Sequence, residues 1–136
     1  MSLHYPKPTH NDSSNYLVSG IPYVLSSISA PVNTGTPIAV SFPYVTQRIW
    51  VDCTSGSVRV GFSSNGVSNT PATKNYYVLA ASSPNLELRV RVGQLFVLSN
   101  AGTTSQFSVI AELTPAPGDQ IAGGILKNWS GSAGIG

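Results

Sequence analysis

Hydrophobic and polar residues alternate along several short segments of the chain, and this alternation is the clearest structural signal in the sequence. In residues 86–92, every second position holds a leucine or a valine, and the positions between them are charged. A period of two is typical of a β-strand that buries one of its faces. The same pattern recurs in three further segments, residues 48–53, 57–62 and 106–113.

The segment at residues 48–53 differs from the others because both of its faces carry apolar side chains. Ile49, Val51 and Cys53 fall on one face, and Trp50 falls on the other. We therefore expect this strand to be covered on both sides.

Four more strands are predicted, at residues 22–29, 36–42, 75–80 and 94–99. Glycine, asparagine and proline separate the segments, as is typical of turns, and no segment shows the period of 3.6 that marks a helix. The turn residues Thr54–Gly56 predict a hairpin between the strands on either side of them. Residues 100–105 are expected to link the last two strands.

Eight short strands without intervening helices predict an all-β fold, an eight-stranded antiparallel sandwich or barrel of the jelly-roll type. An immunoglobulin-like sandwich is the rival, but the Cys…Trp…Cys pattern of that fold is absent. The β-sandwich domain is expected at residues 21–114. An irregular N-terminal arm at residues 1–20 and a glycine-rich C-terminal tail at residues 115–136 complete the predicted organisation.

Composition narrows the classes of protein that the chain can represent. Only 9% of the residues are charged, and the formal net charge is +2. Helical bundles and coiled coils need more charged residues, and disordered chains have less apolar content than the 41% found here. The few Lys and Arg argue against nucleic-acid binding. No apolar run is long enough to span a membrane, and the first residues do not form a signal peptide.

The titratable residues give little support for catalysis. His4 and His10 both fall in the predicted N-terminal arm, where a general base would be poorly held. Cys53 lies in the apolar alternation of a strand, which favours a buried side chain over a nucleophile. The acidic residues are dispersed, so we predict no enzyme activity, no metal site and no cofactor. Such low surface charge is unusual for a free monomer, and burial of the surface in an assembly accounts for it.

Binding of a carbohydrate or a receptor is the alternative to a purely structural role. Lectin-like sandwiches use exposed aromatic rings and amides, and Tyr76 and Tyr77 adjoin Asn75. Adjacent residues of a strand point to opposite faces, so at least one of these tyrosines is expected to point away from the core.

Three segments together resemble a known family of proteins. Residues 49–67 (IWVDCTSGSVRVGFSSNGV), 75–80 (NYYVLA) and 86–90 (LELRV) are similar to small single-jelly-roll structural proteins of large icosahedral double-stranded DNA viruses. The similarity is greatest to vertex (penton) or minor capsid proteins. It covers residues 45–113 and is a pattern of strands and turns.

The resemblance implies a non-enzymatic capsid subunit that is assembled into the virion in the host cell. It implies a ring of five copies at the vertex, with a trimeric decoration protein or a receptor-binding fibre head as alternatives. The arms would then hold neighbouring capsid proteins. Apolar residues in the predicted arm and tail are the candidate anchors at this interface: Tyr16, Leu17, Ile125, Leu126 and Trp129.

Overall fold

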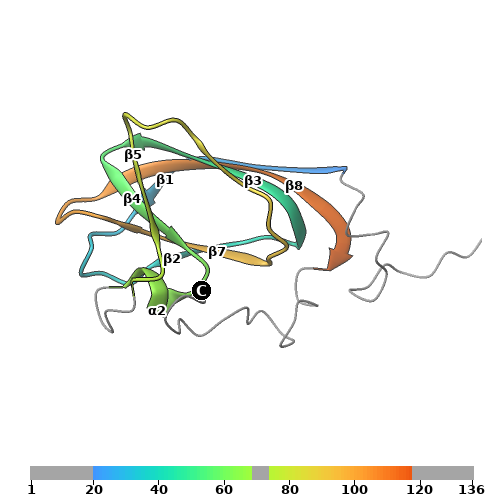
Figure 1. The fold of residues 1–136 in the computed structure, drawn as a ribbon, viewed down its shortest axis with the longest axis horizontal. Helices are drawn as coiled ribbons and strands as arrows, with labels where there is room; N and C mark the ends of the chain where they lie inside the picture. Colours follow the sequence, from blue (N-terminus) through green and yellow to red (C-terminus); the bar gives the residue numbers. More distant parts are fainter. Residues whose placement is uncertain (1–19, 69–73, 118–136) are drawn as a thin grey trace, which may run out of the picture.

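The computed structural model describes residues 20–68 and 74–117, which form eight β-strands and one short helix (Figure 1). All eight strands predicted from the sequence are present. Most of the predicted N-terminal arm and C-terminal tail lies outside the described residues. The elements are β1 (Ile21–Ala30), β2 (Ile38–Ser41), β3 (Tyr44–Ser55), β4 (Ser57–Gly61), α2 (Ser64–Val67), β5 (Tyr77–Ala80), β6 (Leu86–Leu88), β7 (Gln94–Ser99) and β8 (Ser105–Pro117).

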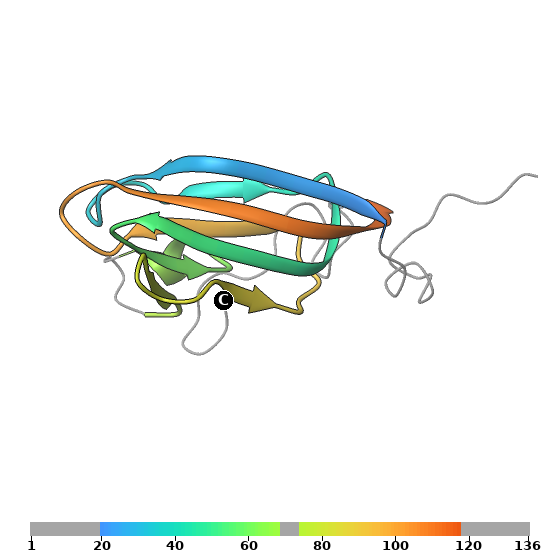
Figure 2. The ribbon, with the colours of Figure 1, turned by 90° about the horizontal axis from the view of Figure 1, so that it is seen from above.

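The strands form two four-stranded sheets that pack face to face as a sandwich. One sheet, here called the β8 sheet, has the order β1-β8-β3-β6, and the other, the β7 sheet, has the order β2-β7-β4-β5. Every neighbouring pair is antiparallel. Consecutive strands lie in opposite sheets, with the single exception of β4 and β5, which share the β7 sheet. This arrangement is the jelly-roll order. Figure 2 shows β1, β8 and β3 side by side along one layer.

The hairpin predicted at Thr54–Gly56 is wrong. β3 and β4 belong to different sheets, so these residues carry the chain from one layer to the other. Gly56 has a φ of +76°, and a Cβ at this position would collide with the Ser105 hydroxyl. Glycine is therefore required here by both conformation and space. A short turn with glycine can join two strands of one sheet or cross between two sheets, and its sequence is similar in both cases. The sequence therefore does not distinguish a hairpin from a crossing, which explains the wrong prediction.

The predicted alternation of buried side chains is confirmed. Ile49, Val51, Phe107 and Val109 are fully buried between the sheets. The segment at residues 86–92 forms a ladder only in β6, yet its alternate apolar side chains still pack on the core.

Beyond β6, hydrogen bonds of the buried Thr46 replace the ladder. The Thr46 hydroxyl donates to the Val90 carbonyl oxygen (2.7 Å) and accepts from the Val92 amide (3.1 Å). Backbone hydrogen-bonding groups that leave a sheet must find such partners when they are buried. Thr46 therefore holds residues 90–92 against β3 without a strand pairing.

β8 is also longer than the strand predicted at residues 106–113, because it runs from Ser105 to Pro117. β1 begins opposite Leu113, so among the described strands β3 alone pairs with the last residues of β8, as at Tyr44 and Pro117. Proline cannot donate a ladder hydrogen bond and is tolerated in a strand where one side lacks a partner. This explains why a segment with two prolines remains a strand.

Strand alternation places Arg59 on the outward face of β4, and the structure shows that this face is covered. Arg59 does face away from the core, but only 7% of it is exposed. Its Nε donates to Asn100 Oδ1 (2.9 Å), its Nη1 donates to the Val67 carbonyl (3.1 Å), and its guanidinium lies 4.6 Å from the ring centroid of Tyr76. The turn that contains α2 covers this face of the β7 sheet. A helix of one turn is too short to show a period in the sequence.

Candidate assembly interface

An exposed row of apolar side chains crosses the outer face of the β8 sheet. Val24 of β1 pairs with Ile110 of β8, and Ile110 pairs with Trp50 of β3. Residues opposite one another in a sheet share a face, so the three side chains form a continuous row. Val24 is 59% exposed and Ile110 is 51% exposed, while Trp50 is half-buried. We call these three residues the apolar row.

Two hollows flank the apolar row, and Trp50 and Ile110 line both of them. The first, which we call the Glu112 hollow, has a volume of about 580 Å³. The second, which we call the Asp52 hollow, has a volume of about 470 Å³. The Glu112 hollow is completed by Gly20, Ile21, Pro22, Ala111 and Glu112, and the Asp52 hollow by Asp52, Ser83, Pro84, Asn85 and Ser108.

Charged side chains border the apolar row on the β3 and β6 side. Arg48 Nε lies 3.4 Å from Glu87 Oε1, and the Arg48 guanidinium lies 5.5 Å from the centroid of the Trp50 ring. Arg89 Nε also approaches Glu87 Oε1, at 3.5 Å. Exposed ion pairs of this kind stabilise a fold by less than about 1 kcal/mol, so they orient the indole more than they hold the sheet. Glu112 forms no ion pair with any described residue.

β1 is the longest edge strand of the sandwich, and β8 is its one ladder partner among the residues the structure describes. A bulge interrupts it between Leu25 and Ile28. Ser27 adopts a φ of +55°, and its amide donates to Ser108 Oγ (3.1 Å). Bulges bend an edge strand and hinder the addition of a further strand. The apolar face beside β1 is therefore a better candidate for a protein contact than the edge itself.

The candidate anchors Tyr16, Leu17, Ile125, Leu126 and Trp129 all lie outside the described residues, as do His4 and His10. Trp50 lies on the outer face of its strand, where a cover was expected, and its neighbour Ile110 is open to solvent. Sequence reasoning did not single out Val24 or Ile110. The sequence does contain a signal for both residues, because each places an apolar side chain at an outward position of its strand.

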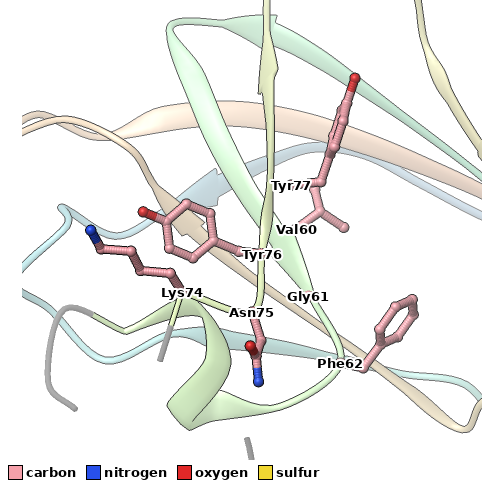
Figure 3. Close-up of a pocket in the computed structure, with 7 residues that line it drawn as sticks. All are labelled: Val60, Gly61, Phe62, Lys74, Asn75, Tyr76 and Tyr77. Atoms are coloured by element: carbon pink, nitrogen blue, oxygen red, sulfur yellow. The ribbon is translucent and has the colours of Figure 1, made fainter. Parts of the chain in front are cut away.

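The two adjacent tyrosines point to opposite sides, as predicted (Figure 3). Tyr76 stacks on Arg59, whereas Tyr77 is 60% exposed. Figure 3 shows Tyr77 and Phe62 on one side of the chain, with Lys74 beside Tyr76 on the other. A hollow of about 380 Å³ is lined by these four residues together with Val60, Gly61 and Asn75.

Cys53 is the single cysteine of the chain, and it is buried in the core. Burial raises the pKa of its thiol, and the neighbouring Asp52 adds to this rise. The thiol donates to the carbonyl oxygens of Ser55 (3.5 Å) and Gly56 (3.4 Å). A buried, protonated thiol is a poor nucleophile, so the geometry gives Cys53 a packing role.

The described residues contain neither a metal-binding cluster nor a membrane-spanning helix. No group of three or more His, Cys, Asp or Glu side chains within residues 20–68 and 74–117 is placed to hold a metal ion. Within the same ranges, no helix has the length and apolar character needed to cross a bilayer.

Comparison with known proteins gives a distant similarity in structure. No protein-family model matches the sequence, and no curated protein matches it. Among solved structures, the chain is similar to one from Bacillus endospore appendages, described as a novel family of disulfide-linked pili. The two are 20% identical, the match covers 71% of this chain and 93% of that chain, and the TM-score is 0.37. At this level of similarity, the role of the appendages is not transferred to this protein.

Proposed function

We propose that the protein is a non-enzymatic structural subunit that assembles with copies of itself through the outer face of the β8 sheet. The apolar row carries this proposal, because Val24 and Ile110 hold more than half of their surface in water. Exposed apolar patches with polar rims mark protein contacts in soluble proteins. Association would remove these side chains from water, which is the main favourable term in most protein interfaces.

The low charge of the chain supports association of like copies. With 9% charged residues and a formal charge of +2, identical subunits repel one another only weakly. A surface of this kind favours association over a dispersed monomer.

The finer assignment is a capsid subunit, most specifically a vertex protein in a ring of five. The resemblance of residues 49–67, 75–80 and 86–90 to vertex proteins supports it, and so does the jelly-roll order, which many capsid domains share. In a ring, each copy presents two unlike surfaces, and rotation closes the assembly. A trimeric decoration protein is the alternative within the same class.

Native mass spectrometry of the full chain tests the assembly. We expect a discrete oligomer, with a mass of five times 14.2 kDa for the vertex ring. The interface between two subunits of a stable oligomer should bury at least about 1,000 Å² of surface in total. A protein that stays monomeric at every accessible concentration would contradict the proposal. Images of assembled particles then distinguish a vertex position from a decorating one.

A carbohydrate-binding sandwich is the second candidate, and the exposed ring of Tyr77 favours it. The hollow beside this ring offers the amide of Asn75 and the ammonium of Lys74 as polar groups. Aromatic rings with a few polar groups are typical of small-ligand sites. Binding on a glycan array that is lost in Tyr77→Ala and kept in Tyr44→Ala would support it. No glycan binding by the wild-type chain would exclude it.

A further inference from the structure

We propose that the Glu112 hollow of one subunit receives the tail segment around Trp129 from a neighbouring subunit. This inference rests on the proposed assembly and names the pair of surfaces that makes it. The candidate anchor is Trp129, a tryptophan in a segment rich in glycine, and the Glu112 hollow is the site that would bind its side chain.

The hollow has the size and chemistry for an aromatic side chain. Its volume of about 580 Å³ falls within the usual range of about 300–1,000 Å³ for sites that enclose small organic groups. Ile21, Pro22, Trp50 and Ile110 supply apolar walls. Ile110 is also half exposed, so a side chain seated there would cover surface that is now in contact with water. Tryptophan is among the most effective anchors of protein interfaces, since it buries about 150–250 Å².

Charge complementarity supports this segment of the chain as the occupant. Glu112 borders the hollow and forms no ion pair with any residue in the described ranges. Residues 118–136 contain one basic residue, Lys127, which lies two positions before Trp129. With Trp129 in the hollow, Lys127 is close enough along the chain to approach the Glu112 carboxylate. A pair at the rim of an interface contributes more to register and orientation than to affinity.

The course of β8 favours a neighbouring subunit over the same one. From Glu112 the strand continues to Pro117 along the ladder with β3, so the chain leaves its own hollow behind. Ten further residues lead from Pro117 to Lys127, which span up to about 33 Å when extended. A return to the same hollow would require the chain to reverse direction, which favours an adjacent copy.

Charge exchange in the full chain tests the contact. Glu112→Lys and Lys127→Glu should each weaken assembly about tenfold through like-charge repulsion, and the double variant should return to within about threefold of wild type. Arg89→Glu, which changes an exposed charge outside the hollow, is the matched control and should not be rescued by Lys127→Glu. Single effects that simply add in the double variant would overturn the pairing of Glu112 with Lys127.

Mixing two defective variants tests whether the contact joins different copies. Ile110→Arg blocks the hollow but keeps the tail, and Leu126→Ser/Trp129→Ala removes the anchor but keeps the hollow. Each should fail to assemble alone, and a mixture should form one-to-one complexes. If neither variant alone nor their mixture associates, the contact between copies is excluded. If wild type and Leu126→Ser/Trp129→Ala both assemble normally while Ile110→Arg does not, this inference fails and the proposed function stands. Normal assembly of Ile110→Arg contradicts both, and so does a monomeric wild type.

Discussion

Ile110 and Val109 are neighbours in β8 and point to opposite faces of the sheet: Ile110 is half exposed, and Val109 is fully buried between the layers. This pair separates the stability of the fold from the stability of the assembly. Ile110→Ala should change the free energy of unfolding of the monomer by less than about 0.5 kcal/mol, because its side chain lies on the surface. The same change should reduce assembly.

Val109→Ala should have the reverse effect and lower the free energy of unfolding by about 2 kcal/mol, because it opens a cavity in the core. Urea denaturation of dilute protein measures stability, and light scattering measures assembly. Equal losses of stability in the two variants would show that Ile110 is also a core residue.

Arg59 should be sensitive to replacement although it is charged. Arg59→Met removes the hydrogen bonds to Asn100 and to the Val67 carbonyl and leaves their acceptors buried, so we expect a loss of about 3 kcal/mol. Arg89→Met is the control, since the Arg89 side chain is 73% exposed and should contribute less than about 1 kcal/mol. Chemical denaturation compares the two. If Arg59→Met left the free energy of unfolding unchanged, the turn that contains α2 would stay packed on the β7 sheet without the guanidinium.

Gly56 should not tolerate a side chain. Gly56→Ala places a Cβ against the Ser105 hydroxyl at a positive φ, and we expect a loss of about 2 kcal/mol or more. Gly102→Ala, whose Cβ would meet no atom within 4 Å, is the matched control and should be close to neutral. Thermal unfolding monitored by circular dichroism measures both. Similar melting temperatures for the two variants would contradict the requirement at Gly56.

Cys53 should make stability depend on pH in the alkaline range. Burial raises the pKa of this thiol in the folded protein above its ordinary value of 9.0. The folded state therefore holds the proton more tightly, and stability should be constant below pH 9 and fall as the pH rises through the raised pKa. Burial also raises the pKa of Tyr23 from 10.0, so its contribution begins at higher pH.

Urea denaturation of wild type and Cys53→Ala between pH 7 and pH 10 isolates the thiol. The decline near pH 9 to 10 should be smaller in the variant, and the native thiol should react slowly with a disulfide reagent. Rapid modification of the native protein at pH 8 would show that Cys53 is accessible.

Much of the fold follows from alternation, because a side chain at every second position reports which face of a strand is buried. Residues 106–113 illustrate this, since Phe107, Val109 and Leu113 are all in the core. Alternation says nothing about which strands pair, so the turn at Gly56 was assigned to a hairpin and not to a crossing between sheets. It also treats every outward position as solvated, which failed at Arg59, where α2 covers the sheet.

The candidate interface was predicted less well than the fold. Sequence reasoning placed the anchors in the arms, because apolar residues in glycine-rich segments are unusual. Ile110 was passed over, although an isoleucine between Val109 and Ala111 leaves no polar face at that point of β8. Its exposure depends on the absence of a covering element in the described fold, and only the three-dimensional arrangement gives that information.

The place of β8 has a consequence for the synthesis of the protein. β8 is the last of the described strands along the chain, yet it lies between β1 and β3, which do not pair with one another. While the chain is being made, neither β1 nor β3 has its main partner until residues 105–117 have emerged. Folding that depends on contacts between distant parts of a chain is slow. A nascent chain that stops short of β8 therefore cannot complete this sheet or display its outer face, so only copies that include β8 would be competent to join an assembly through this face.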